Sequence, residues 1–353
     1  MKKTQVALAT LALVASTAAL ADGVTVYGRV DASVAKQTGS NTSFDGSGNW
    51  DTSVFGIRGS EDLGNGLKAS FNLETGVNIG NGASANNGTT TEVGAGTVNN
   101  LFARLANINL SGDFGTVSAG TQLSPYVAAA LGGVANNNES FYVPLLILAG
   151  GITAQPFGAG GATAGTANTG GFFIPNAISY TTPSISGVDA TVMATAAAGT
   201  ADDKYVAGRA SYVTGALKIN AGYHARGSAA ATASHYTGHS ITGSYQVMEG
   251  VTVAAGIHHN NDKLLSVKTD SSNIGVSYSI MPSTAVSVQY ARNDSASAAS
   301  IMNFGLLHNI SKRTYAYATM SRGTNGASTV YSLRDVTSTA DRTGYAVGLG
   351  HNF

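Results

Sequence analysis

The chain has 353 residues, no cysteine, and 19 basic residues against 19 acidic residues. Charged residues make up 11% of the sequence, less than half of the roughly 25% that is typical of a soluble domain. The balanced charge gives no electrostatic reason to bind nucleic acid, and the lack of cysteine excludes a disulfide framework and any cysteine-based metal site.

The first 21 residues have the features of a secretory signal peptide. A basic start at Lys2 and Lys3 precedes an apolar stretch over residues 6–20, and residues 19–21 (Ala-Leu-Ala) supply the small residues of a cleavage site. The apolar stretch is shorter than the roughly 20 residues that a membrane-spanning helix needs. We therefore predict that the protein is exported and that residues 22–353 form the mature chain.

The mature chain reads as a succession of β-strands. Apolar and polar residues alternate with a period of two, which is the pattern of a strand with one apolar and one polar face. The alternation is clearest over residues 24–34, 67–74, 217–224, 251–258 and 274–280. No stretch shows a convincing helical period, so the sequence predicts an all-β fold.

Short turns and long loops alternate along the chain. The predicted turns lie near residues 62–66, 111–115, 182–187, 214–216, 248–250, 281–284 and 310–314. The predicted loops, which are rich in Gly, Asn, Ser and Thr, lie near residues 37–49, 80–99, 124–173, 198–203, 227–235, 260–267, 293–299 and 323–339. These 15 connections join 16 strands. An even number of strands, with turns at one end and loops at the other, is typical of an antiparallel 16-stranded transmembrane β-barrel in a bacterial outer membrane.

A soluble β-sandwich would show the same alternation of strands and connections. Such a domain rarely contains so many strands, and its outward face needs charges, whereas both predicted faces here carry few. Tyrosine and phenylalanine recur near the predicted strand ends, as the aromatic girdles of a membrane barrel require. The last predicted strand ends on Phe353, in phase with its apolar face. A terminal aromatic residue of this kind looks like the signal that the outer-membrane assembly machinery reads, so we favour the barrel.

Several stretches resemble the general porins of Gram-negative bacteria, in particular the beta-proteobacterial and neisserial kind. They are residues 23–32, 55–69 with Glu74, 101–104, 110–117, 311–314 and 351–353. The resemblance implies a homotrimer of 16-stranded barrels in the outer membrane, each an independent aqueous channel. It also implies that a third external loop, here residues 124–173, folds inward and narrows the channel.

The sequence departs from the porin pattern in the region that would set ion preference. Thr121 and Ser179 stand where this family commonly carries basic residues. Glu139 is the only charged residue in the predicted constriction loop, and residues 143–149 of that loop are apolar. These departures argue against a steep electric field between loop and wall.

Alternation along each strand predicts which charges line the lumen, because residues between the apolar positions face water. The pore-lining candidates are Arg29, Asp31, Arg58, Lys68, Glu74, Glu139, Arg209, Lys218 and Arg226. Asp189, His224 and His258 share this face, while Arg104 has the lipid-facing parity and is expected at the rim or on a bulge that turns it inward. Basic residues outnumber acidic ones on the strands, which predicts a weak anion preference.

No pattern isolates a catalytic or metal site. His258 and His259 are strand neighbours that point to opposite faces, so they cannot both bind one metal ion. No spacing pairs a nucleophile with a base, and the glycine-rich residues 158–165 lack the lysine of a phosphate-binding loop.

We therefore predict a porin through which small hydrophilic solutes and ions diffuse passively, with no enzymatic activity and no cofactor. The expected partners are outer-membrane lipid and lipopolysaccharide, two further copies of the chain, the assembly machinery, and the solutes themselves, with no nucleic acid. Two alternatives remain open. One is a substrate-selective channel of the same fold, and the other is an outer-membrane hydrolase or adhesin with a closed lumen.

Overall fold

The computed structural model describes residues 23–84, 89–91, 97–99, 101–135, 172–195, 204–227, 236–262, 267–294, 299–324 and 341–353. The predicted signal peptide, Glu139 and most of the predicted constriction loop lie outside these ranges.

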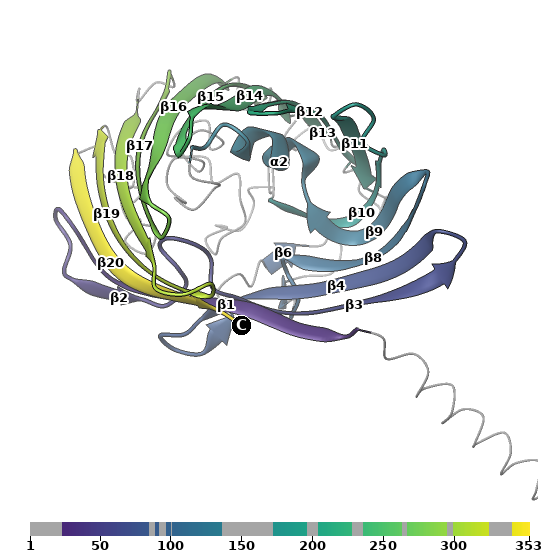
Figure 1. The fold of residues 1–353 in the computed structure, drawn as a ribbon, viewed down its shortest axis with the longest axis horizontal. Helices are drawn as coiled ribbons and strands as arrows, with labels where there is room; N and C mark the ends of the chain where they lie inside the picture. The colour runs from purple at the N-terminus through teal and green to yellow at the C-terminus, as the bar shows by residue number, and fades with distance from the viewer. Residues whose placement is uncertain are drawn as a thin grey trace, which may run out of the picture.

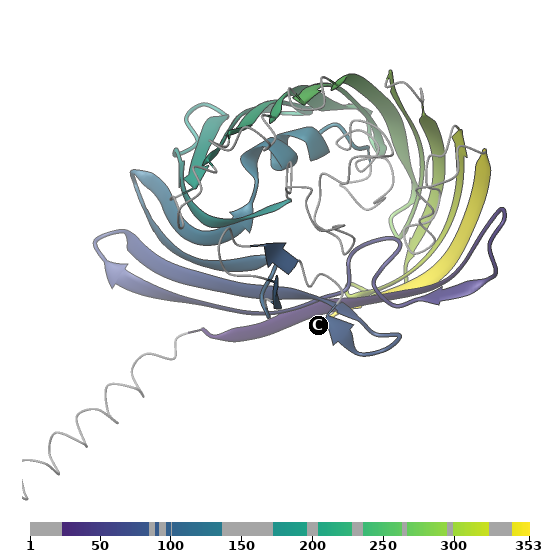
Figure 2. The same ribbon diagram turned by 180° about the vertical axis from the view of Figure 1, so that it is seen from behind.

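Sixteen antiparallel strands form a closed barrel, which appears as a ring in Figure 1 and from behind in Figure 2. The barrel strands are β1 (Thr25–Gln37), β3 (Val54–Gly64), β4 (Leu67–Asn78), β8 (Leu105–Gly112), β9 (Gly115–Leu123), β10 (Phe173–Thr181), β11 (Val188–Thr195), β12 (Lys204–Thr214), β13 (Leu217–Gly227), β14 (Tyr236–Met248), β15 (Val251–Asp262), β16 (Val267–Met281), β17 (Thr284–Asn293), β18 (Ser300–Asn309), β19 (Thr314–Thr324) and β20 (Arg342–Asn352). Each pairs with the next barrel strand along the chain, and β20 pairs with β1 to close the ring. The predicted fold class is therefore confirmed.

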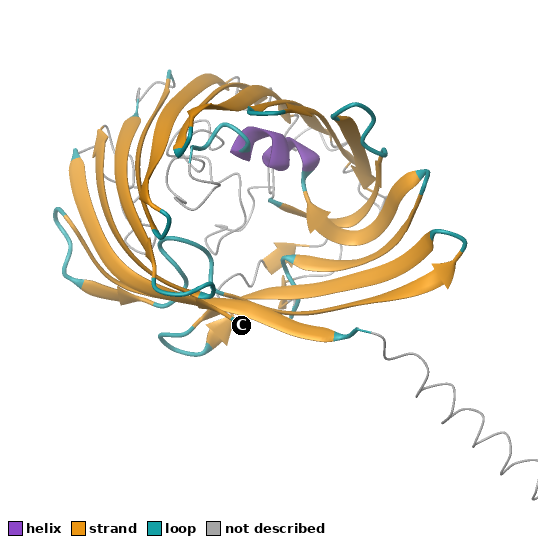
Figure 3. Ribbon diagram, in the orientation of Figure 1, coloured by secondary structure: helices purple, strands orange, loops and turns teal. Residues whose placement is uncertain are grey.

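Four short strands and one helix complete the described structure. The short strands are β2 (Ser43–Asp45), β5 (Ala83–Ser84), β6 (Thr89–Thr91) and β7 (Thr97–Asn99). The helix α2 (Pro125–Leu131) lies inside the ring of strands (Figure 3). Among the described residues, no helix is long and apolar enough to cross a membrane.

The seven predicted short turns all connect neighbouring barrel strands. The turn between β3 and β4 shows why the sequence determines them: Asn65 and Gly66 have φ of 52° and 76°. A two-residue hairpin whose central residues both have positive φ matches the twist of the flanking strands, and the Asn-Gly pair is its strongest sequence signal. Turn chemistry therefore fixes the strand register at this end of the barrel.

The two faces of the barrel wall invert the pattern of a soluble protein. Large apolar side chains are exposed on the outside, including Val26, Ile108, Ile178, Val192, Ile219, Ile241, Ile257, Ile274 and Val347. Polar side chains are buried on the inside, including Ser33, Asn220, Thr242, Asn273, Gln289 and Asn303. Each large apolar side chain left in water would forgo about 1.5–3 kcal/mol of burial free energy, so this exterior requires a lipid environment.

The last residue of the chain completes the seam of the barrel. Phe353 donates its backbone N–H to the carbonyl of Gly28 at 3.0 Å and accepts the Gly28 N–H at 3.2 Å. Its ring covers Gly28, where an added Cβ would lie 2.4 Å from the ring. Glycine at this position therefore lets the terminal aromatic ring pack against β1. The role of Phe353 as an assembly signal stays a prediction.

Candidate functional site

The candidate functional site is the lumen of the barrel, into which two segments fold. One consists of residues 124–135, with α2 at its start, and it lies on the inner wall formed by β12 to β16. The other consists of residues 45–53, which bind Asp31 of β1 and pack through Trp50 on residues of β18 and β19. The ring of strands encloses both, and α2 is on the opposite side of the ring from β1, β3 and β4 (Figure 1).

The helix α2 is fixed to the inner wall by side chains of three strands. The ring of Tyr126 stacks on His224 of β13, with centroids 3.8 Å apart and planes at 5°. The Tyr126 hydroxyl donates to Asn260 Oδ1 on β15 at 3.1 Å. Thr242 Oγ1 on β14 donates to the carbonyl oxygen of Ala129 at 2.6 Å. These contacts are buried, so the helix is held against the wall and away from the axis.

Small residues allow this close approach of helix to wall. An added Cβ at Gly222 of β13 would lie 2.8 Å from the Cβ of Ala129. After the helix, Asn273 Nδ2 donates to the carbonyl of Gly133 at 2.6 Å, and Ser277 Oγ donates to that of Ala135 at 2.9 Å. Residues 124–135 therefore follow the inner wall of the barrel, while residues 136–171 of the predicted constriction loop lie outside the described residues.

One buried carboxylate accepts several of the hydrogen bonds that hold the second inward segment, which Arg29 also binds through the carbonyl of Thr52. Asp31 on β1 is 0% exposed and accepts hydrogen bonds from the hydroxyls of Tyr315 at 3.1 Å and Tyr317 at 2.6 Å. It also accepts the backbone N–H of Asn49 at 3.2 Å and that of Asp51 at 3.1 Å. Four donors, two from β19 and two from the segment, therefore converge on the two oxygens of Asp31.

The strand sequences explain how the tyrosines reach this carboxylate. An added Cβ at Gly348 would lie 2.3 Å from the Tyr317 ring, and one at Gly350 would lie 2.0 Å from the Tyr315 ring. The two glycines of β20 therefore leave room for the rings to lie across the strand. Trp50, the only tryptophan of the chain, is 2% exposed and packs on Tyr317 with ring centroids 5.5 Å apart.

These contacts change the interpretation of two predictions. Asp31 points inward, as the alternation predicts, but its carboxylate is covered and does not face the water of the lumen. The predicted external loop over residues 37–49 begins as expected after β1. Its end, from Asp45 onward, turns back into the barrel because Asp31 binds the backbone of Asn49 and Asp51.

Three ion pairs hold acidic side chains of the lumen. Arg29 contacts Asp51 at 2.5 Å, and Arg209 contacts Asp189 at 2.7 Å. Arg104 contacts Glu74 at 2.6 Å. Burial raises the pKa of the Asp51 carboxyl above its ordinary value, and the charge of Arg29 opposes this rise. Each of these three carboxylates is therefore neutralised by an arginine.

Arg104 was expected either at the rim of the barrel or turned inward, and its side chain points inward to Glu74. It precedes β8, so the alternation of the strand does not apply to it. Its guanidinium lies over the ring of Phe173, 4.6 Å from the centroid, and reaches the carboxylate of Glu74. Glu74 also accepts a hydrogen bond from the hydroxyl of Tyr27 at 3.0 Å.

Three other basic candidates, Arg58, Lys68 and Lys218, form no ion pair within the described part of the chain. Arg58 lies over the ring of Tyr27, 4.9 Å from the centroid. Lys68 and Lys218 are exposed, and each is the second residue of a strand that follows a short turn, so they line the mouth at the turn end. Arg226 lies on the inward face of β13. Glu139 lies outside the described residues.

Two lumen residues escaped prediction from the sequence. Arg342 is 5% exposed on the inward face of β20, and extending the alternation back from Val347 would have identified it. Asp51 lies in a loop, where no periodicity indicates its direction.

His258 is buried on the inward face, whereas His259 is exposed on the outer face, as predicted. Among the described residues, no group of three or more His, Cys, Asp or Glu could hold a metal ion.

Comparisons with known proteins agree with this architecture. The family model described as Gram-negative porin matches residues 7–328. Outer membrane porin protein 32 of Delftia acidovorans is 30% identical over 379 residues, covering 100% of both chains. The structure of the anion-selective porin from Comamonas acidovorans matches with a TM-score of 0.74 at 24% identity, covering 94% of this chain and 99% of that one. The trimer form of OmpT from Vibrio cholerae matches with a TM-score of 0.63 at 10% identity, covering 94% and 99%.

Proposed function

Because the chain belongs to the Gram-negative porin family and forms a channel in the outer membrane, we propose that this channel lets small hydrophilic solutes and ions diffuse passively, with a weak preference for anions. Family membership makes the protein a non-enzymatic channel, so the flux of a solute follows its concentration gradient. The barrel supplies the path through the membrane, and the two inward segments reduce its cross-section.

The proposed anion preference rests on the charge pattern of the described lumen. Asp51, Glu74 and Asp189 each contact an arginine, so their fields are largely cancelled. Arg58, Lys68 and Lys218 form no ion pair among the described residues. An excess of unpaired positive charge on a pore wall raises the local concentration of anions and repels cations. The similar Comamonas protein is an anion-selective porin, which supports the same direction.

We place the narrowest part of the path between α2 and the facing wall of β1, β3 and β4. That wall carries the guanidinium groups of Arg29 and Arg58, and Arg104 contacts it through Glu74 of β4. The buried anchors of the two inward segments, Tyr126 and Asp31, keep the width of this region fixed. We further propose that residues 124–173 as a whole form the constriction loop.

A gradient experiment tests the ion preference. The protein is reconstituted in a planar bilayer with tenfold different KCl concentrations on the two sides, and the reversal potential is measured. A sign that corresponds to chloride permeating faster than potassium supports the proposal. A cation-selective potential would contradict the proposed role of the unpaired basic residues.

Three further proposals concern processing and assembly. We propose that residues 1–21 are removed on export, which amino-terminal sequencing of protein from outer membranes tests. We propose a homotrimer, as in the trimer form of OmpT. A band at monomer mass after electrophoresis in mild detergent without boiling would contradict it. We also propose that the assembly machinery reads Phe353, and that its deletion reduces the amount of folded barrel in the outer membrane.

A further inference from the structure

A row of ionisable side chains crosses the outer face of the barrel at one level. His239 on β14 pairs with His259 on β15, which pairs with Asp270 on β16. Asp294 continues the row, because its backbone N–H donates to the carbonyl of Asp270 at 2.9 Å. All four side chains are exposed and have the parity of the apolar residues that face outward.

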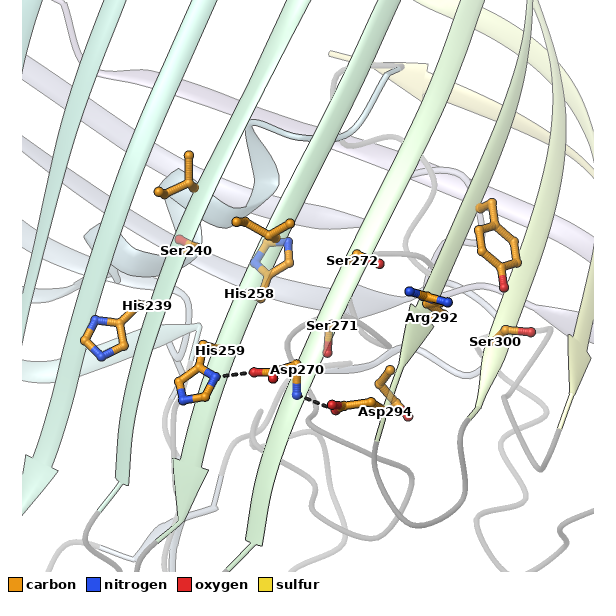
Figure 4. A pocket seen from close by; sticks show the side chains of 14 residues that line it. His239, Ser240, His258, His259, Asp270, Ser271, Ser272, Arg292, Asp294 and Ser300 are labelled. Carbon is orange, nitrogen blue, oxygen red and sulfur yellow. Dashed lines mark hydrogen bonds and ion pairs between the residues drawn. The ribbon is translucent and has the colours of Figure 1, made fainter.

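The members of the row contact one another, as Figure 4 shows. The rings of His239 and His259 lie 6.3 Å apart. Nδ1 of His259 is in hydrogen-bonding contact with the carboxylate of Asp270. The backbone N–H of Asp270 donates to Oδ1 of Asp294 at 2.5 Å. Both carboxylates therefore already have a donor within the row.

Arg292 lies on the same outward face, two residues before Asp294, and is therefore closer to the mid-height of the barrel wall. On β17 it pairs with Ser272 on one side and Ser300 on the other. Its side chain is exposed, and among the described residues it forms no ion pair. Together with the row it lines a depression with a volume of about 700 Å³ (Figure 4). The depression therefore contains a guanidinium group that is available to a ligand.

The level of the row matches the outer edge of the hydrocarbon layer. From the turn end, the outward-facing apolar stretch starts at Val247 on β14, Val251 on β15 and Ile280 on β16. Counted from these residues toward the loop end, the row lies eight residues away on β14 and β15 and ten residues away on β16. A barrel strand needs about 9–11 residues to cross the hydrocarbon layer, and in this kind of barrel the loop end faces the cell exterior.

Ionisable side chains on a lipid-facing wall are costly within the hydrocarbon layer and tolerated at its edge, where polar headgroups begin. A planar guanidinium group matches phosphate in geometry and charge. We propose that this depression is a docking site for the phosphate of a glycolipid headgroup in the outer leaflet, with Arg292 as the phosphate-binding residue and His239 as a neighbouring donor. The site depends on the position of the barrel in the outer membrane, and it is independent of the ion preference of the lumen.

The test measures lipid binding by the full-length protein in detergent. Native mass spectrometry follows the titration of diphosphorylated lipid A and of chemically dephosphorylated lipid A, with inorganic phosphate as a competitor. Arg292→Gln is the test variant, and Arg292→Lys keeps the charge but not the bidentate geometry. Arg322→Gln is the matched control, because Arg322 is an exposed outward arginine at the loop end of β19 whose cross-strand neighbours are Met302 and Thr343.

We expect Arg292→Gln to weaken binding of diphosphorylated lipid A about tenfold, which corresponds to the loss of one charge-assisted contact. Arg292→Lys should weaken it less, Arg322→Gln should leave it unchanged, and conductance should be the same in all variants. Equal losses in Arg292→Gln and Arg322→Gln would overturn the proposal, as would equal affinity for dephosphorylated lipid A. Complete displacement by an equal concentration of inorganic phosphate would show a site for free anions and would also overturn it.

Discussion

Replacement of Asp31 by alanine should loosen the attachment of residues 45–53 to the wall of the barrel, to which Arg29 also binds them through the carbonyl of Thr52. The Asp31 carboxylate is the common acceptor for the hydroxyls of Tyr315 and Tyr317 and for the backbone N–H groups of Asn49 and Asp51. Without it, four buried donors lose their acceptor. Two of them belong to the segment itself, and water can satisfy these two only if the segment moves into the lumen.

The size of the effect follows from the number and the burial of these bonds. A hydrogen bond to a charged group contributes about 1.5–3 kcal/mol, and such values do not add in full within one network. Removal of one partner from a buried charged network costs about 3–5 kcal/mol. The docking equilibrium of the segment should therefore shift by a factor of about 10²–10⁴. Asp31→Asn, which keeps one carbonyl acceptor, should shift it less.

Trp50 reports this loosening directly, because it is the only tryptophan in the chain and is 2% exposed. In the Asp31→Ala variant its fluorescence emission should move to longer wavelength, and iodide should quench it more strongly. Asp189→Ala is the matched control: it removes a lumen carboxylate that contacts Arg209, and Trp50 emission should not change. If Asp31→Ala folds with wild-type Trp50 emission and quenching, the anchoring role of Asp31 is refuted.

Three further predictions concern the lumen. Alanine at both Arg58 and Lys68 should move the reversal potential in a KCl gradient toward cation selectivity, and an unchanged potential would remove both residues from the ion path. Thr242→Val should weaken the contact between α2 and the wall by about 1 kcal/mol, which should increase the current noise of the open channel; unchanged noise would show that α2 is held without this bond. Since burial raises the pKa of Asp51, its charge is lost at a higher pH than that of an ordinary aspartate. Acidification should therefore free the charge of Arg29 and increase anion selectivity, and an equal increase in Asp51→Asn would assign the effect to other groups.

The sequence alone predicted the features that depend on local alternation and turn chemistry. The period of two assigned Arg29, Arg209 and Lys218 to the inner face, because successive side chains of a strand point to opposite sides. Asn65 and Gly66 fixed a hairpin for the same local reason. The number of barrel strands then followed from the alternation of turns and loops.

Features that depend on distant residues were not predictable in this way. The partners of Asp31 include Tyr315 and Tyr317, which lie more than 280 positions away along the chain. The helix α2 has only seven residues, too few to show a helical period. The row that contains His259 and Asp270 can be recognised only once the register between neighbouring strands is known, because each of its members comes from a different part of the chain.

The most direct test of the channel itself is its single-molecule conductance. The protein, expressed without residues 1–21 and refolded, is added to a planar bilayer in symmetric KCl, and the current is recorded at constant voltage. An open, water-filled barrel predicts discrete current steps that grow linearly with voltage and salt, in groups of three if the proposed trimer inserts as a unit. A folded barrel that inserts but carries no current would contradict an open channel, because it would show that the inward segments close the lumen.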